Sequence, residues 1–304
     1  MWDSLDPRND DTRDRDAADP RDADPIDARD VFTQGLTLPR GLERERVHIH
    51  DHHDYHLRGS ESRALATIGA FRVVPADDLR DDLGRAGDVR HGDLERLREA
   101  GLINTLAPLD RGERTTLVTL TERERDVLES HRSRASASSH TFYAGSVKSR
   151  ELSHDAQLYR AYLRAAERLC ANGARIQRVV LDYELKRDYQ RFLQARNKGR
   201  SDSDGRPDRT REEVRDWAQE HHLPVVSDRV QFPDVRIEYE HPDGRRDVED
   251  VEVTTVHYRG AHAAGKVQAG FTRFRGSSAR VGGRSGHGGK GSAPFDPHGA
   301  EEYL

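Results

Sequence analysis

The chain has 304 residues, of which 35% are charged and 34% hydrophobic, and its formal net charge is −5. It has no run of eighteen apolar residues and no basic-then-apolar start, which argues against a membrane-spanning helix and a signal peptide. Cys170 is the single cysteine, so the sequence excludes an internal disulfide and favours a cytoplasmic location without membrane contact.

Residues 1–59 are expected to be an arm and a linker without a core. Residues 1–30 hold eleven Asp and five Arg with almost no apolar residue, so burial cannot offset their ordering entropy, and we expect a disordered acidic arm. A histidine-dense stretch follows at His48, His50, His52, His53 and His56. Positions 48, 52 and 56 would share a helix face, but no ligand framework for zinc or nickel accompanies them, so a polar linker is the preferred interpretation.

Residues 60–132 have the pattern of a compact domain. SESRALATIGAF begins with a Ser/Glu capping pattern, Pro75 opens a second short helix in ADDLRDDL, and a third helix in HGDLERLREAGL ends at Gly101. The runs INTLAPL and TTLVTL then flank a polar tip at residues 110–113, and Thr121 caps a last helix. This order predicts a winged helix-turn-helix domain.

A winged helix of this kind would bind double-stranded DNA through its third helix and its wing. The third helix would present Arg90, His91, Arg96 and Arg98 to the major groove, and Arg111 and Arg114 on the wing would reach phosphates or the minor groove. Acidic residues on the second and third helices make this surface less basic than that of a strong DNA binder. A module for protein contacts therefore stays open as the alternative.

The rest of the chain reads as a linker at 133–150, a mixed α/β domain at 151–275 and a flexible Gly-rich basic tail at 276–304. The α/β domain begins with an amphipathic helix after Ser153, and a strand in IQRVVLDYEL continues into a second helix. TREEVRDWAQEHH is a third helix, and RGAHAAGKVQAGFTRF closes the domain as a helix. The tail either touches nucleic-acid backbones or is a simple disordered segment.

Residues 230–258 are expected to form a β-hairpin with two acids on one face. Because strand side chains alternate, Asp234 shares a face with Arg236 and Glu238, and Glu252 shares one with Asp250 and Thr254. Asp234 and Glu252 could then lie side by side, and a divalent cation, Mg²⁺ or Mn²⁺, would relieve their repulsion. The alternative is an ordinary edge hairpin with a solvated charged face.

These strands resemble the core of PD-(D/E)xK nucleases, with the match at Pro233-Asp234 and at Glu252, Val253 and Thr254. The resemblance implies that Asp234 and Glu252 hold the metal and that a lysine two places beyond the second acid orients the attacking water. Thr254 stands at that lysine position, so catalysis would need Lys266 from the next helix. Glu184 in LDYELK is the candidate for the additional acid that such cores often use.

The larger arrangement resembles that of the replication-relaxation family. The resemblance rests on the winged-helix pattern and on the segments HDAQLYRAYLR, VVLDYELKR and FPDVRIEYE. That resemblance implies a DNA-binding protein of plasmid or mobile-element replication, with His154 at a position where the family pattern has a histidine. His154 is equally well explained as a neighbour of the helix start.

Three hypotheses for function follow from these patterns. The preferred one is a DNA-binding accessory protein whose nuclease-like domain is a scaffold, because Thr254 replaces the expected lysine. The second is a metal-dependent endonuclease or nickase that uses Asp234, Glu252 and Lys266. The third is a winged-helix transcriptional regulator. Partners would be replication or transfer proteins, and a homodimer stays open.

Overall fold

The computed structural model describes residues 28–48, 54–106, 115–133, 140–145, 148–199, 207–254 and 261–275 and shows a mixed α+β fold. The predicted acidic arm up to residue 27, the wing tip and the Gly-rich tail lie outside the described residues. So do Arg111, Arg114, His50, His52 and His53. No helix within the described ranges is long and apolar enough to cross a membrane.

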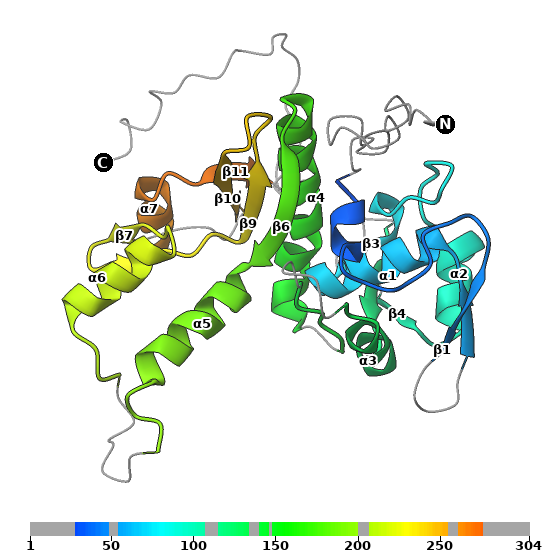
Figure 1. The fold of residues 1–304 in the computed structure, drawn as a ribbon, viewed down its shortest axis with the longest axis horizontal. Coiled ribbons are helices and arrows are strands. Elements are labelled where there is room, and N and C mark those ends of the chain that lie inside the picture. Colours follow the sequence, from blue (N-terminus) through cyan, green and yellow to red (C-terminus); the bar gives the residue numbers. More distant parts are fainter. Residues whose placement is uncertain are drawn as a thin grey trace, which may run out of the picture.

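The amino-terminal half places three helices around a small antiparallel sheet whose strand order is β3-β5-β4 (Figure 1). A separate antiparallel hairpin, β1-β2, precedes α1. In chain order the elements are η1 (Asp30–Thr33), β1 (Glu45–His48), β2 (Asp54–Leu57), α1 (Gly59–Phe71), β3 (Val74–Pro75), η2 (Ala76–Asp78), α2 (Gly92–Glu99), β4 (Ile103–Leu106), β5 (Leu117–Leu120) and α3 (Glu122–Ser130).

The carboxyl-terminal half is built on a four-stranded sheet of order β11-β10-β9-β6, in which β10 and β11 are parallel and the other pairs antiparallel. A short hairpin, β7-β8, lies apart from it. In chain order the elements are α4 (Ser149–Ala171), β6 (Arg175–Leu181), α5 (Asp182–Gln194), α6 (Arg211–Glu220), β7 (Val225–Val226), β8 (Arg229–Val230), β9 (Val235–Glu240), β10 (Arg246–Thr254), α7 (Ala261–Gln268) and β11 (Thr272–Arg275).

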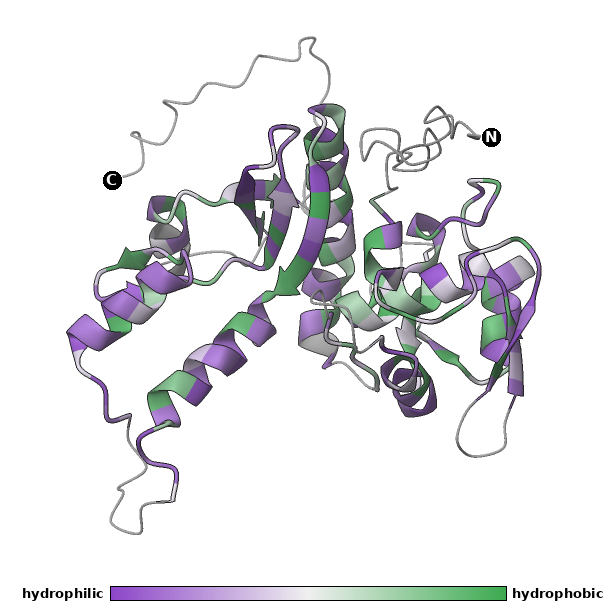
Figure 2. Ribbon diagram, viewed as in Figure 1, coloured by the Kyte–Doolittle hydropathy of each residue, from purple (hydrophilic) through white to green (hydrophobic). Residues whose placement is uncertain are grey.

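Helix α4 stands between the two halves and covers one face of the four-stranded sheet (Figure 1). Its predicted apolar face is confirmed, because Leu158, Tyr162, Ala165 and Leu169 are all buried. The same hydrophobic cluster continues from Phe32 and Phe71 in the amino-terminal half to the strands of the sheet. Figure 2 shows the contrast with α5 and α6, along which hydrophilic residues predominate. Helix α4 therefore joins the two halves through one core.

A second, smaller hydrophobic cluster lies on the other face of the sheet, under α5 and α6. Its centre is Trp217, whose ring stacks on Phe192 at 5.5 Å and on His221 at 4.0 Å between centroids. The second face of the sheet is thus covered where the acids lie. Asp234, Arg236 and Glu252 are all buried, so the alternative of a solvated charged face does not hold there.

The structure corrects the expected linkers. Val31 and Phe32 are 1% and 0% exposed, so the described part of residues 28–48 supplies core side chains, where the sequence predicted a polar arm and linker. His48 and His56 lie on the strands β1 and β2, where the sequence suggested a helix face. In the segment 133–150, Phe142 is buried, and the buried ring of His140 lies 3.2 Å from the carbonyl oxygens of both Val31 and Val179.

Two predicted helices are also corrected. After Pro75 only the short turn η2 forms, because the Asp81 carboxylate accepts hydrogen bonds from the backbone N–H groups of Leu83 and Arg85 and holds the chain in a loop. The closing helix ends at Gln268, and residues 272–275 form β11 because they pair in parallel with β10. Helix α4 begins at Ser149, earlier than expected. The predicted Thr121 cap is confirmed by its bond from the Glu124 N–H.

Candidate functional site

The two acids of the predicted hairpin are brought together by the register of β9 and β10. Val235 pairs with Val251 and Arg236 with Asp250, which sets Asp234 opposite Glu252 at the adjoining position. The apolar side chains of these strands face the core under α4, and Glu252 alternates with them to the opposite face. Asp234 lies just before the start of β9, where its carboxylate also reaches His154 of α4. The backbone N–H of Asp234 also donates to the carbonyl of Val251, at 3.1 Å, and extends the ladder to this residue.

Asp234 is 7% exposed, and its Oδ2 atom has two donors. The backbone N–H of Val253 donates to it at 2.8 Å, and Nε2 of His154 lies 3.3 Å away. Burial alone would raise the pKa of Asp234, but the hydrogen bond from His154 and the charges of His154 and Lys266 lower that pKa overall. Asp234 is therefore a carboxylate at neutral pH.

Lys266 provides the ammonium group that the sequence lacks at position 254. Its Nζ atom lies 2.5 Å from Oε2 of Glu252 and 2.6 Å from the carbonyl oxygen of Phe232. Lys266 and Glu252 are 8% and 3% exposed, so the pair is buried. Thr254 takes no part in this contact, because its hydroxyl donates to the carbonyl of Phe274 on β11 at 3.0 Å. Helix α7 thus delivers the lysine that β10 does not.

His154 connects Asp234 to a second buried acid on α4. Its Nδ1 atom lies 3.3 Å from Oδ1 of Asp155, while its Nε2 atom faces Asp234. Burial disfavours the imidazolium, but the hydrogen bonds with Asp155 and Asp234 outweigh it and raise the pKa of His154 to about 10. The ring is therefore a cation that donates from both nitrogens.

Glu184 is not brought to the acid pair. It is buried in the first turn of α5, where it accepts a hydrogen bond from the Thr141 hydroxyl at 2.9 Å and lies 3.7 Å from Nη2 of Arg178. Burial raises its pKa. Within the described residues it makes no hydrogen bond or ion pair with Asp234 or Glu252, so its expected role as the additional acid has no support from the geometry.

Three groups of this site were not predicted from the sequence. They are Asp155, the Phe232 carbonyl and Arg72, whose Nη1 atom lies 3.2 Å from Oδ2 of Asp155. Asp155 follows His154 directly, and that adjacency was the available signal. The carbonyl and Arg72 reach the site only through tertiary packing.

Two adjacent carboxylates suit a small hard cation such as Mg²⁺ or Mn²⁺, which proteins usually hold through one or two carboxylates while water and substrate phosphates complete the shell. In the part of the chain that the structure describes, no group of three or more His, Cys, Asp or Glu side chains is arranged to hold a metal ion. A cation held here would therefore have at most Asp234 and Glu252 as side-chain ligands among the described residues, and water or phosphate would supply the others.

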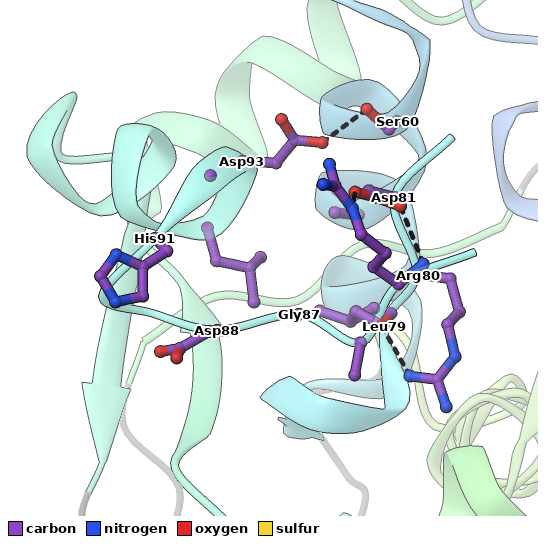
Figure 3. A pocket seen from close by; sticks show the side chains of 13 residues that line it. Ser60, Leu79, Arg80, Asp81, Gly87, Asp88, His91 and Asp93 are labelled. Carbon is purple, nitrogen blue, oxygen red and sulfur yellow. Dashed lines mark hydrogen bonds and ion pairs between the residues drawn. The ribbon is translucent and has the colours of Figure 1, made fainter. Parts of the chain in front are cut away.

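The described residues of the expected DNA interface lie just before α2 and in its last turn. Arg90, His91, Arg96 and Arg98 are exposed, but Arg96 is also 3.4 Å from Oε1 of the buried Glu61. A pocket of about 310 Å³ opens beside this helix start, and Figure 3 shows the acids Asp81, Asp88 and Asp93 among the groups that line it. These carboxylates reduce the positive potential that the arginines create.

Comparison of the chain with protein-family models, curated proteins and solved structures finds no match.

Proposed function

We propose that this protein binds DNA and cleaves or nicks it at a divalent-metal site formed by Asp234 and Glu252, with Lys266 as the catalytic lysine. The observation that carries this proposal is the 2.5 Å contact between Lys266 Nζ and Glu252 Oε2 beside Asp234. The sequence favoured a non-catalytic scaffold only because Thr254 replaces a lysine. The position of Lys266 removes that objection, so the PD-(D/E)xK resemblance becomes an argument for chemistry.

Each side chain has a role that follows from its contacts. Asp234 and Glu252 would hold the cation, which, when bound, lowers the pKa of a coordinated water and neutralises charge on the scissile phosphate. The Lys266 ammonium, fixed by Glu252 and the Phe232 carbonyl, keeps a proton donor at the edge of the pair for the attacking water or the phosphate oxygens. His154 fixes the rotamer of Asp234 through Oδ2.

The amino-terminal half would bring the DNA to this site. Helices α1, α2 and α3 with strands β4 and β5 follow the order of a winged helix, although η2 replaces the expected second helix. The exposed Arg90, His91 and Arg98 would then contact DNA, chiefly its phosphates. The same proposal includes a role in plasmid or mobile-element replication and contacts with replication or transfer proteins. It also includes a cytoplasmic location and a homodimer.

A second candidate is the DNA-binding accessory role without cleavage. It is favoured by one observation: each acid already has a cationic partner in the protein, His154 for Asp234 and Lys266 for Glu252. A charge-balanced pair of this kind is stable without a metal, and the domain would then act as a scaffold for DNA or for partner proteins. A transcriptional regulator would have the same site and would differ in the DNA that it recognises.

The deciding experiment incubates the protein with supercoiled and linear plasmid in Mg²⁺, Mn²⁺ or EDTA and follows both mobility shift and nicking. The nuclease proposal expects metal-dependent nicking that Asp234→Asn and Lys266→Met each abolish while the shift remains. Lys186→Met is the control, because Lys186 pairs with Asp182 at the exposed surface of α5. A salt-sensitive shift without nicking would establish the accessory role, and nicking retained in Lys266→Met would contradict the assigned lysine.

A further inference from the structure

Arg72 joins the last turn of α1 to the acid site through two side chains of α4. Its guanidinium lies 3.2 Å from Asp155 Oδ2, and Oδ1 of the same carboxylate faces His154 at 3.3 Å. His154 in turn faces Asp234 at 3.3 Å. A continuous chain of charged groups thus runs from the amino-terminal half to the residue expected to hold the metal.

The backbone of Arg72 supports a role beyond a surface ion pair. Its φ is 67°, a conformation that non-glycine residues rarely adopt and that persists only where the surroundings hold it. The guanidinium also lies over the ring of Tyr183 at 5.6 Å from the centroid, and the Tyr183 hydroxyl donates to the carbonyl of Ala70 at 3.2 Å. Contacts from α4 and α5 therefore hold Arg72 in place.

We propose that Arg72 is a positioning residue for the metal site, acting through Asp155 and His154 on the carboxylate of Asp234. This inference rests on the proposed function. Without the guanidinium, Asp155, which is 6% exposed, loses the charge that faces Oδ2, and its carboxylate is free to turn away from His154. His154 then no longer holds Oδ2 of Asp234, and the carboxylate can leave the rotamer in which it lies across from Glu252. Outer-shell partners of this kind typically change metal affinity by about 10- to 100-fold.

The test measures Mn²⁺ binding directly on the full chain without DNA, from the electron paramagnetic resonance signal of free Mn²⁺. Arg72→Gln is expected to raise the dissociation constant for Mn²⁺ about ten-fold. Arg72→Lys keeps the positive charge and is expected to recover part of the lost affinity. Arg63→Gln is the matched control. Arg63 lies on α1, which Arg72 directly follows, and its side chain is 22% exposed against 28% for Arg72. Its ion-pair partner is Asp30, which is not one of the groups of the acid site.

The outcomes separate the inference from the function on which it rests. An unchanged Mn²⁺ affinity in Arg72→Gln, or an equal loss in Arg63→Gln, overturns the positioning role while the metal site stands. If the unmodified chain binds no Mn²⁺, or if Asp234→Asn binds it equally well, the proposed metal site fails and the role of Arg72 fails with it. Urea unfolding of each variant confirms that the proteins compared are folded.

Discussion

Arg236 fastens α6 to the four-stranded sheet, and its removal should strongly destabilise the protein. The side chain is 4% exposed and holds Asp250 with two parallel bonds, Nε to Oδ1 at 2.7 Å and Nη2 to Oδ2 at 2.8 Å. It also donates to the carbonyl oxygens of His221 and His222, at 2.5 and 2.8 Å, directly after the end of α6. One guanidinium therefore satisfies a partly buried carboxylate and two backbone acceptors.

Arg236→Met keeps most of the side-chain volume but leaves these three acceptors without their donor. Breaking a buried ion pair from one side costs about 3 to 5 kcal/mol, because the remaining charge stays desolvated. With a urea m value of about 3 kcal/mol/M, the unfolding midpoint should fall by more than about 1 M. The double variant Arg236→Met with Asp250→Met should be more stable than Arg236→Met alone, because no unpaired charge remains.

Urea titration at 25 °C, followed by the fluorescence of Trp217 in the adjacent cluster and by circular dichroism, measures these differences. The reasoning is refuted by a loss below about 1 kcal/mol in Arg236→Met, the range of exposed ion pairs. It is equally refuted if the double variant is less stable than the single one. Arg215→Met is the matched control, because Arg215 pairs with Asp228 while its side chain is 56% exposed.

Three further predictions concern Glu124, His140 and Gly87. Glu124 is 0% exposed, and its carboxyl oxygens have no hydrogen-bond partner among the described residues. Burial raises the pKa of Glu124 well above its usual range, so the free energy of unfolding should fall as pH rises above about 4.5. Glu124→Met should stabilise the protein by about 1 to 3 kcal/mol at pH 8 and abolish this fall, as measured by urea unfolding at several pH values. Burial lowers the pKa of His140 to about 4, so on acidification the unfolded chain binds a proton at this residue before the folded protein does. Up to about 3 kcal/mol of stability should therefore be lost between pH 6.5 and 4. A His140→Gln variant with the same pH dependence would contradict this. Gly87→Ala should lower the melting temperature, because a Cβ atom there would lie 2.5 Å from the carbonyl oxygen of Ala76 and 2.7 Å from Leu94 Cδ1.

Local signals in the sequence predicted many elements well. Thr121 caps the helix that follows it, Gly101 takes a positive φ just beyond α2, and the alternating runs around residue 240 form a hairpin. Each of these features depends on residues a few positions apart, so the sequence contains the information. The facing of Asp234 and Glu252 follows from the same short-range alternation.

The errors lie where distant parts of the chain decide the structure. Residues 272–275 continue a helical pattern, but pairing with β10 makes them a strand. Val31, Phe32 and His140 occur in polar surroundings, and only the packing of α4 against α1 and the sheet encloses them. The same holds for the site. Lys266 was a candidate from the sequence, but its contact with Glu252 depends on the tertiary position of α7.

Strand β11 determines how far the chain can be shortened before the lysine is lost. Helix α7 is held at both ends by paired strands, since β10 precedes it and β11 runs alongside β10 after it, with Phe274 buried against α4 under the Arg164 guanidinium. A polypeptide that stops at residue 268 would contain all residues of α7 but would lose β11, whose pairing with β10 holds the end of the helix. A shortened chain for crystallisation or domain dissection should therefore extend to Arg275, although the last acid of the site in the sequence is Glu252.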